Sequence, residues 1–510
     1  MPLRLWLRGG CNCVVMTNVI SFLLDRTGNE QDVFLVGRDA VYTYAAFKEL
    51  VFKCSDYLDA QHLPADAVVC LAGSNTSEYL GFLFAALGKG YSVTNINPNL
   101  TPFEIVQRVQ YVKSPLLLVE DGAIDAMTIA AIGESGVNVK PFSRAALAQS
   151  NPSPFEVNTK PAAAFIQFTG GTSGAFKAAI ITHENIIGNV SQIMEHFATV
   201  VKGRKARVLV TIPFYHSFSL VFNVFHALRM GGSCVLVRNV RVFEDVFFAA
   251  RNFAPHIMVA VNTMYKRFIQ HPAFNAHDFD SLEICIGGGE KIQPDTKRLW
   301  KSKTGKELYE AYGLTETTAM LICNPLNERN SIEYAGIALP GTQIKLLNND
   351  GNALGADEKT GDIWVKGPQV TIGYYANEHA NNEFFAEGWF NTGDVGEFNE
   401  EGFLKILDRS KDLINVSGLK VYPAEVEAVL MGAEGVLDCA VIGIKDEHTG
   451  ERVVACIVSQ AAINEDKLKQ YCTGKLAAYK VPKEFIVVDA IPKSGIGKTS
   501  RQLLKQKLTA

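Results

Sequence analysis

Residues 67–90 read AVVCLAGSNTSEYLGFLFAALGKG, and this stretch indicates the fold class. Residues 67–73 form a short apolar run typical of a buried strand. Residues 76–90 follow with a hydroxyl cap, an apolar helical pattern and a glycine stop. Similar strand-like runs lie farther along the chain, with helical patterns such as 243–253 between them: 114–120, 207–213, 233–239 and 256–262. This alternation predicts βαβ units and largely parallel sheets.

The pattern changes near residues 341–408, where strands are joined by short turns such as NNDG and NEEG. Such turns favour antiparallel hairpins. A polar run, DRSKD (408–412), precedes a new set of helix and strand patterns. We therefore predict an α/β fold: a large N-terminal domain of parallel-sheet βα layers with a small antiparallel β subdomain, then a small mobile α+β C-terminal domain. The predicted divisions are 1–15 (a start extension before Met16), 16–410 and 411–510.

Composition excludes several classes of protein. Hydrophobic residues make up 47% and charged residues 20% of the 510 residues, as in globular proteins. The net charge is −4, so no nucleic-acid partner bound through broad charge is expected. The 10 cysteines are scattered without paired CxxC motifs, which favours free thiols in a reducing compartment. No apolar run reaches about 18 residues, so we expect a cytoplasmic protein, with loose membrane contact left open.

A glycine-rich loop follows the strand-like residues 165–168. Its residues combine glycines, hydroxyls and one cation: Thr169, Gly170, Gly171, Thr172, Ser173, Gly174 and Lys177. Glycines let backbone N–H groups approach an anion, and a lysine adds positive charge, so the loop is a candidate phosphate site. The alternative is a turn that only connects two elements. The G-x-x-x-x-G-K-[ST] spacing of the common nucleotide-triphosphatase loop is absent.

Three other stretches could complete such a site. ICIGGGEKI (284–292) is a strand that runs into glycines, where a flat base could lie on the backbone. EAYGLTETT (310–318) contains Glu316, an oxygen ligand suited to magnesium. GWFNTGDVG (388–396) presents Asp394, which could accept hydrogen bonds from two ribose hydroxyls. Each residue also has an ordinary structural explanation when it is taken alone.

The order of five motifs is more specific: TGGTSGAFK, YGLTETT, GWFNTGDVG, DRSKDLINVSGLKVYPAEVE and PKSGIGKTSR. It resembles the adenylate-forming superfamily of acyl-CoA synthetases, luciferases and peptide-synthetase adenylation domains, from about Tyr42 to Arg501. Stretches such as PFYHSFSL and VKGPQVTIGYY look most like bacterial long-chain fatty-acid–CoA ligases. The resemblance implies a two-step ligase. A carboxylate attacks the α-phosphate of Mg-ATP to give acyl-adenylate and pyrophosphate, and the CoA thiol then displaces AMP.

The resemblance also implies roles for single residues. Thr169, Gly170, Gly171, Thr172, Ser173, Gly174 and Lys177 match the loop that meets the outer phosphates. Gly289 and Tyr312 match the adenine pocket, and Asp394 and Arg409 match ribose contacts. Thr315 matches an α-phosphate contact and Glu316 the magnesium ligand. Lys498 matches the mobile lysine that stabilises charge as the adenylate forms, Lys411 the hinge between domains, and Gly418 the space for the CoA arm. His216 matches a position near the substrate carboxylate.

Two points limit what the resemblance implies. The phosphate loop of the family has proline and glycine on either side of its lysine, whereas Phe176 and Ala178 flank Lys177 here, and Phe176 could alter the mobility of the loop. The acyl group is expected to be an apolar medium- or long-chain fatty acid, because no basic residue is evident in the acyl-end motifs to pair with a second carboxylate. An aryl or other acid, a carrier protein in trans as acceptor, and a non-enzymatic nucleotide-binding regulator are the alternatives. A homodimer is suggested by the family only.

Overall fold

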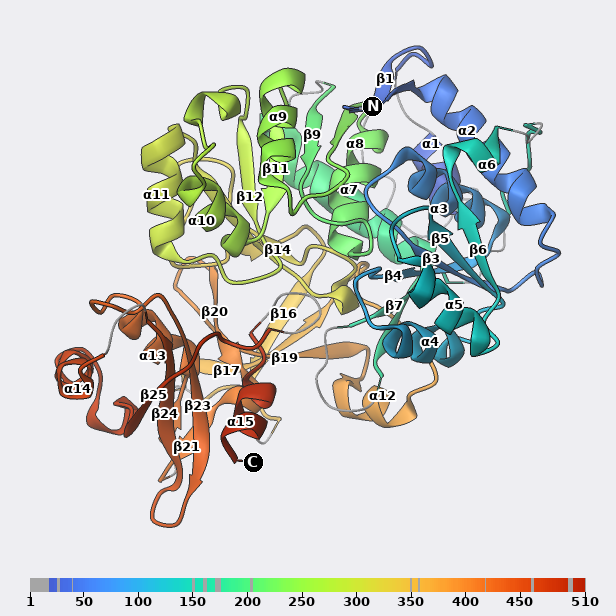
Figure 1. Ribbon diagram of the computed structural model, residues 1–510. Coiled ribbons are helices and arrows are strands. Elements are labelled where there is room, and N and C mark those ends of the chain that lie inside the picture. Colours follow the sequence, from blue (N-terminus) through green and yellow to red (C-terminus); the bar gives the residue numbers. More distant parts are fainter. Residues whose placement is uncertain are drawn as a thin grey trace.

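The computed structural model describes residues 18–24, 28–38, 40–148, 152–158, 163–169, 176–201, 205–348, 351–355, 358–417, 419–459, 463–493 and 499–509 (Figure 1). The proposed extension 1–15 and the predicted site residues Gly170, Gly171, Thr172, Ser173, Gly174, Gly418 and Lys498 lie outside these ranges.

The stretch quoted first forms the strand and helix that its pattern predicts. Strand β3 (Val68–Ala72) is fully buried, and helix α3 (Ser77–Lys89) follows it. The Thr76 hydroxyl accepts a hydrogen bond from the Tyr79 N–H at 3.3 Å, which caps the start of α3. Gly90 ends α3 with φ of 89°, a left-handed conformation that glycine adopts without strain.

Two mainly parallel sheets form the large domain. The first runs β6-β5-β3-β4-β7-β8, with β7 and β8 antiparallel. Besides β3, its strands are β4 (Ser92–Ile96), β5 (Leu116–Glu120), β6 (Val139–Phe142), β7 (Phe165–Phe168) and β8 (Ala178–Ile181). The prediction of largely parallel sheets is confirmed.

The second sheet runs β15-β14-β13-β12-β11-β9-β10-β1-β2, and its edge pairs are antiparallel. Its strands are β1 (Val33–Gly37), β2 (Val41–Thr43), β9 (Arg207–Val210), β10 (Ser233–Leu236), β11 (Ile257–Ala260), β12 (Ile284–Gly287), β13 (Leu308–Tyr312), β14 (Ile322–Cys323) and β15 (Ile337–Ala338).

Side chains on the two faces of each sheet pack into different cores. Val69 and Leu71 of β3 share one core with Val208 of β9, so this core is common to both sheets. Helix α3 and a π-helix, Ser219–Phe225, are buried in it. On the outer faces, α4 (Pro102–Tyr111) and α5 (Ala126–Glu134) cover the first sheet, while α9 (Phe243–Phe253), α10 (Asn262–Gln270) and α11 (Pro294–Thr304) cover the second.

The remaining helices of the large domain are short or lie around the shared core. They are α1 (Val19–Leu24), α2 (Tyr44–Asp59), α6 (Arg144–Leu147), α7 (His183–Val201), α8 (His226–Arg229) and α12 (Glu378–Phe384). In the part of the chain that the structure describes, no helix is both long and apolar enough to span a bilayer.

The predicted antiparallel subdomain is confirmed. Strands β16, β17, β19 and β18 lie in that order, and β20 pairs with β19. Their bounds are β16 (Gln343–Leu347), β17 (Thr360–Lys366), β18 (Phe385–Ala386), β19 (Trp389–Phe398) and β20 (Leu404–Arg409). Asp394 of β19 is the register partner of Arg409 at the end of β20. This pairing places two predicted ribose contacts side by side.

The C-terminal part has its own sheet, β22-β21-β24-β23, with β25 on β24 (red in Figure 1). Its strands are β21 (Ile414–Val416), β22 (Leu419–Val421), β23 (Asp438–Asp446), β24 (Gly450–Val458) and β25 (Glu484–Val487), and its helices are α13 (Pro423–Leu430), α14 (Glu465–Thr473) and α15 (Arg501–Thr509). A single 3-10 turn, Ser410–Asp412, connects β20 to this part. The boundary at 410/411 stays a prediction.

Ion pairs of one arginine link the last helix, α15, to the turn at Ser410–Asp412. Arg501, the first residue of α15, makes ion pairs with Glu427 at 2.8 Å, with Asp412 at 3.1 Å and with Asp408 at 3.7 Å. Asp408 also accepts a hydrogen bond from the Ala424 N–H at the start of α13. The start of α15 is therefore tied to both sides of the connecting turn.

Candidate active site

The two described ends of the glycine-rich loop meet at the edge of the first sheet. The Thr169 N–H donates a hydrogen bond to the Lys177 carbonyl at 2.9 Å, just beyond the antiparallel pair β7–β8. The loop therefore leaves and re-enters the sheet at one narrow point. That geometry fits the predicted phosphate loop, whose central residues are not described.

The ammonium of Lys177 lies against aromatic rings. Its Nζ is 3.7 Å from the centre of the Phe384 ring and 5.7 Å from that of Tyr374. Among the described residues, no carboxylate lies within ion-pairing distance of Lys177. Burial lowers the pKa of Lys177, and the electrostatic attraction of Glu383 and Glu316 opposes this shift. Within the described ranges, the Lys177 ammonium is therefore held by aromatic rings and not by an ion pair.

Glu316 lies in a 3-10 turn, Thr315–Thr317, that follows β13. Its side chain is buried, and the Tyr374 hydroxyl donates a hydrogen bond to Glu316 Oε1 at 2.8 Å. The Thr371 N–H donates to the Glu316 carbonyl at 2.8 Å. Burial and the neighbouring Glu316 carboxylate raise the pKa of Tyr374, so this phenol remains a donor. Thr315 is half-buried beside Glu316.

Asp394 is the centre of a second group. It is 4% exposed. Its Oδ2 accepts a hydrogen bond from the Tyr312 hydroxyl at 2.5 Å, and its Oδ1 pairs with Arg409 Nε at 2.8 Å. The Asp394 carboxylate raises the pKa of Arg409. Burial and the same carboxylate raise the pKa of Tyr312 well above its usual value. Tyr312 ends β13, so this group joins the second sheet to the antiparallel subdomain.

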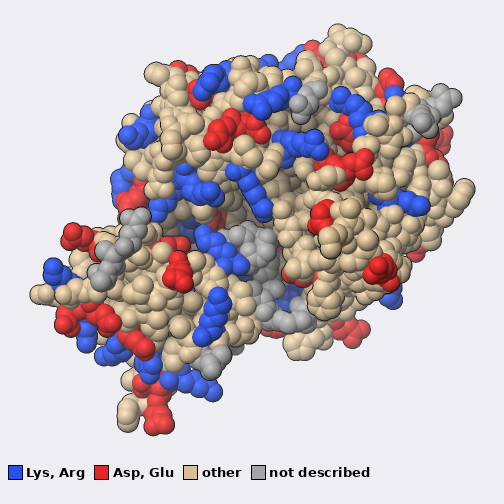
Figure 2. All heavy atoms as spheres, in the orientation of Figure 1, with Lys and Arg blue, Asp and Glu red and all other residues tan. Residues whose placement is uncertain are grey.

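The Glu316 group and the Asp394 group are neighbours. Tyr374 contacts both Lys177 and Glu316. The Phe384 ring under the Lys177 ammonium lies 3.8 Å from the position that a Cβ atom would take at Gly393, and that position is 3.9 Å from Arg409 Nη1. Lys411, the predicted hinge residue, lowers the pKa of Lys177. These residues come from separate motifs, yet they are close enough to interact electrostatically. Figure 2 shows a hollow between the C-terminal part and the large domain, with Lys and Arg side chains at its edges.

Gly289 lies in the turn after β12. Because β12 and β13 are parallel neighbours, this turn lies at the same carboxyl end of the strands as Tyr312, the last residue of β13. Its φ of 79° is left-handed, a conformation that favours glycine. At the adjacent Gly288, a Cβ atom would come within 3.1 Å of the Ala311 carbonyl oxygen and of the Phe218 ring. Protein atoms therefore fill the space beside Gly288. At Gly289, among the described residues, only Val261 Cγ1, at 3.5 Å, lies within 4 Å of the Cβ position, so the backbone is more open at the residue predicted to meet adenine.

His216 lies at the start of the segment that leads into the π-helix. Its N–H donates to the Pro213 carbonyl at 3.1 Å, and its ring is 4.6 Å from the ring of Tyr215. The Tyr215 carbonyl accepts a hydrogen bond from Gln167 Nε2 at 3.2 Å, which ties this segment to β7. His216 is thus placed near the strand that enters the phosphate loop.

Sequence reasoning missed three residues that build this site. Tyr374 holds the Glu316 carboxylate, Phe384 lies under the Lys177 ammonium, and Thr371 donates to the Glu316 backbone. In the sequence, the stretch VTIGYY, which contains Thr371 and Tyr374, shows only a resemblance to the ligases. Their roles depend on contacts across the fold and leave no local spacing to detect.

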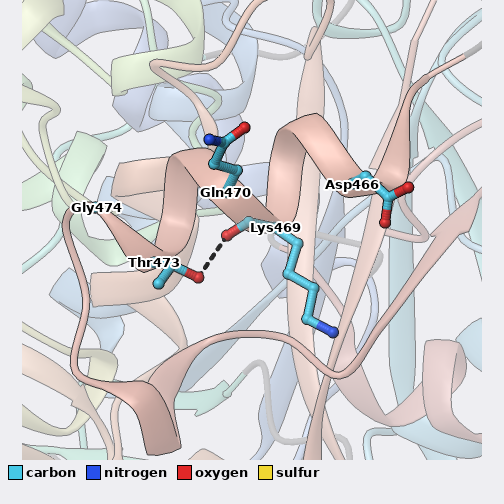
Figure 3. Close-up of a pocket in the computed structure, with 5 residues that line it drawn as sticks. All are labelled: Asp466, Lys469, Gln470, Thr473 and Gly474. Atoms are coloured by element: carbon cyan, nitrogen blue, oxygen red, sulfur yellow. Dashed lines mark hydrogen bonds between the residues drawn. The ribbon is translucent and has the colours of Figure 1, made fainter.

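A separate hollow lies on the C-terminal part, along one side of α14 (Figure 3). It is lined by Asp466, Lys469, Gln470, Thr473 and Gly474. The Thr473 hydroxyl donates to the Lys469 carbonyl, a bond within one helical turn. No predicted site residue lines this hollow, so it is not part of the site.

Two family models match the chain. The model of the AMP-binding enzyme matches residues 25–375, and that of the AMP-binding enzyme C-terminal domain matches residues 425–498. The chain belongs to the AMP-binding enzymes.

This AMP-binding enzyme is similar to the long-chain-fatty-acid–CoA ligase of Yersinia pestis, with 36% identity over 355 residues. The match covers 69% of this chain and 63% of that ligase, so the chain spans less than two thirds of the relative's length. Feruloyl-CoA synthase of an Amycolatopsis species is 29% identical over 462 residues, 89% of this chain and 92% of that protein.

Among solved structures, the AMP-binding enzyme is similar to ATP-bound MatB from Rhodopseudomonas palustris. The TM-score is 0.88 and the identity 26%, over 96% of this chain and 98% of that chain. The match extends over both the large domain and the C-terminal part, and it supports the architecture described above.

Proposed function

We propose that this AMP-binding enzyme is an ATP-dependent acid–thiol ligase that activates a medium- or long-chain fatty acid as the acyl-adenylate and transfers it to CoA. The observation that carries the proposal is a set of contacts: Tyr374 and Phe384 join Lys177 to Glu316 and to β19, the strand whose Asp394 pairs with Arg409. A cation for phosphates, a carboxylate for a metal ion and a carboxylate for ribose are the groups that Mg-ATP requires.

The nucleoside would lie between the Gly289 turn and the Asp394 group. Adenine would rest on the open backbone of the turn, with Tyr312 at its edge. The ribose hydroxyls would donate to Asp394, which Tyr312 and Arg409 already hold in place. A carboxylate fixed by two partners needs little reorganisation when the nucleotide arrives.

The phosphates would extend from there toward Lys177 and Thr169. Magnesium fits this position, because Glu316 offers a buried carboxylate and Mg²⁺ is commonly held by one or two carboxylates together with substrate phosphates. When bound, Mg²⁺ supplies charge neutralisation at the phosphate oxygens. Lys177 and Glu316 interact electrostatically across this space, and the remaining loop residues Gly170, Gly171, Thr172, Ser173 and Gly174 are proposed to add donors.

The first step is attack of the acid on the α-phosphate, with Thr315 at that phosphate and His216 near the carboxylate. Lys498 is proposed to stabilise the charge that develops there. The second step requires CoA in the same cleft, so Lys498 must withdraw. We propose that the C-terminal part turns at Lys411 to allow this, with Gly418 then leaving space for the CoA arm.

The acyl group is the least constrained part of the proposal. The π-helix that follows His216 is buried and rich in aromatic and branched side chains, with Phe218 beside the Gly288 turn. An apolar pocket favours longer chains by about 0.8 kcal/mol per buried methylene. The similarity to the Yersinia ligase supports a fatty acid, and the similarity to feruloyl-CoA synthase keeps an aryl acid as the second candidate.

The described cysteines are unpaired and mostly deep in the cores, which suits a reducing compartment such as the cytoplasm. A carrier protein could replace CoA as the acceptor, and a homodimer is proposed by analogy only.

A panel of acids tests the substrate. Acids from acetate to oleate, with aryl acids beside them, are incubated with ATP and Mg²⁺, and AMP formation is measured with and without CoA. The proposal expects turnover that rises with chain length and depends on CoA. Turnover only with aryl acids would support the second candidate, and no AMP from any acid would contradict the enzymatic function.

Lys498→Ala tests the mechanism. Adenylate formation should slow by about 10²–10³, the usual effect of losing one preorganised charge-stabilising group, while ATP binding is mostly retained. An unchanged forward rate would refute the role assigned to Lys498.

A further inference from the structure

The glycine-rich loop has a phenylalanine just before each of its polar ends. Phe168 precedes Thr169, and Phe176 precedes Lys177. The two rings lie edge to face, with centres 5.4 Å apart and planes at 71°. The hydrogen bond from Thr169 to Lys177 closes the same point. An aromatic pair in this geometry attracts beyond the effect of buried area alone.

Two residues of α4 pack on both rings. The ring centre of Tyr111 is 5.8 Å from that of Phe168 and 5.4 Å from that of Phe176. One turn earlier, the Arg108 guanidinium lies 5.6 Å and 5.3 Å from the same two ring centres. The Glu104 carbonyl holds Arg108 at 2.8 Å. The four side chains form a cluster, Arg108–Tyr111–Phe168–Phe176, which we name the neck cluster.

The neck cluster is joined to the residues that hold Glu316. The Tyr111 hydroxyl donates to the Tyr375 carbonyl at 2.8 Å, and Asn377 Nδ2 donates to the Phe176 carbonyl at 3.0 Å. Tyr375 directly follows Tyr374, whose hydroxyl donates to Glu316 and whose ring faces Lys177. One short segment therefore contacts the neck of the loop, the lysine and the carboxylate.

From these contacts we propose that Phe176 is a positioning residue for the phosphate end of the nucleotide, acting through the neck cluster. It packs between Phe168, Tyr111 and Arg108, fixes the backbone from which Lys177 projects, and so holds the ammonium over Phe384 and Tyr374. Where the family has a proline with a fixed φ, this chain restrains the same point by side-chain packing. The inference rests on the proposed function, because it assumes that polyphosphate is the ligand of the loop.

Phe176→Ala tests the inference, with inorganic pyrophosphate in the presence of Mg²⁺ as the probe. Pyrophosphate affinity, measured by calorimetry, should fall about fivefold to tenfold, since the aromatic and cation–π contacts are lost together. The KM for ATP should rise by a similar factor. Thioester formation from presynthesised acyl-adenylate and CoA should keep its rate, because no outer phosphate is bound in that step. Phe176→Tyr keeps the ring and should restore pyrophosphate affinity.

Phe248→Ala is the matched control. Phe248 in α9 lies under the Arg38 guanidinium at 4.3 Å, so this variant loses the same kind of contact at another place in the large domain. Its pyrophosphate affinity should equal that of the wild type. Unchanged pyrophosphate affinity in Phe176→Ala would overturn the inference. So would an equal loss in both half-reactions that accompanies a lower melting temperature, because that pattern indicates a purely structural role.

The inference and the proposed function fail in different ways. If the wild-type protein binds pyrophosphate yet forms no AMP with any acid, the ligase function is contradicted. The role of Phe176 can then still be tested through pyrophosphate affinity. Wild-type protein that forms AMP normally while Phe176→Ala binds pyrophosphate equally well would contradict the positioning role alone.

Discussion

The two ends of the candidate nucleotide site hold their cations in opposite ways. At the ribose end, Arg409 is paired with Asp394, and this carboxylate raises the pKa of the guanidinium. At the phosphate end, Lys177 lies on the rings of Phe384 and Tyr374, and burial lowers the pKa of its ammonium. The charge at the first end is neutralised within the protein. The charge at the second end has no ion-pair partner among the described residues, and its burial disfavours the charged form.

This difference suggests that the two ends play different parts in nucleotide binding. The ribose end should recognise the nucleoside through fixed hydrogen-bond geometry, and the phosphate end should bind through charge. Both oxygens of Asp394 already accept hydrogen bonds in the protein, so a ribose bound there, as proposed, would meet a group of fixed geometry. If phosphate binds Lys177 as proposed, it would neutralise the ammonium, and partial desolvation of the site would strengthen that attraction. Mutations at the two ends should therefore change different measurements.

Asp394→Ala should give the largest effect. It removes the acceptor proposed for the ribose hydroxyls and leaves Arg409 and Tyr312 without their common partner. Hydrogen bonds to a charged group contribute about 1.5–3 kcal/mol each, so AMP affinity should fall on the order of 100-fold. Calorimetry with AMP measures this. Asp295→Ala removes a carboxylate that is 91% exposed and should leave AMP affinity unchanged. Equal AMP affinity in Asp394→Ala would show that the ribose does not bind there.

Lys177→Met should affect the other end. Pyrophosphate affinity should fall about 30-fold, in line with the loss of one charge-assisted interaction, while AMP affinity should change little because AMP lacks the outer phosphates. The two affinities are measured on the same preparation. A parallel loss of AMP affinity would remove the distinction between the two ends.

Tyr312→Phe should weaken the ribose end by a smaller amount. The variant keeps the ring and removes the hydroxyl that donates to Asp394 at 2.5 Å. AMP affinity should fall about tenfold, and pyrophosphate affinity should be retained. A larger effect on pyrophosphate than on AMP would contradict the assignment of Tyr312 to the nucleoside.

The smallest expected effect is a dependence on pH. Because the pKa of Lys177 is lowered from 10.5, the ammonium loses its proton at a lower pH than an ordinary lysine does. The pyrophosphate affinity of the wild type should decrease severalfold as the pH rises through the lowered pKa of Lys177. Lys177→Arg stays charged and should not show this decrease, so the difference between the two proteins isolates the residue. Identical pH profiles would place the titration elsewhere.

The same lowered pKa has a definite sign for stability. The folded state disfavours the charged lysine, so the unfolded state binds this proton more tightly. The contribution of Lys177 to the free energy of unfolding should therefore rise with pH between its lowered pKa and 10.5. The difference in the free energy of unfolding between wild type and Lys177→Met isolates this contribution, and urea denaturation at several pH values measures it.

Local patterns were sufficient to predict much of the fold. Thr76 and Gly90 bound α3 as the sequence indicates, because caps and stops depend on neighbouring residues. The order of the motifs gave Glu316 and Asp394 as candidates. The groups that hold them could not be predicted, since the hydroxyl of Tyr374 reaches Glu316 across 58 positions and Arg108 meets Phe176 across 68. Such contacts arise from the packing of separate elements and leave no periodic signal.

The ion pairs of Arg501 bear on the proposed movement of the C-terminal part. Arg501 lies three residues after Lys498 in the sequence, and its guanidinium pairs with carboxylates before, within and after the turn at Ser410–Asp412. Glu427 lies within the C-terminal part, whereas Asp408 precedes the turn. If the C-terminal part rotates at Lys411 as proposed, the Arg501–Glu427 pair travels with it and the Arg501–Asp408 pair must break, so this arginine would hold the C-terminal part in the position described here until the rotation begins.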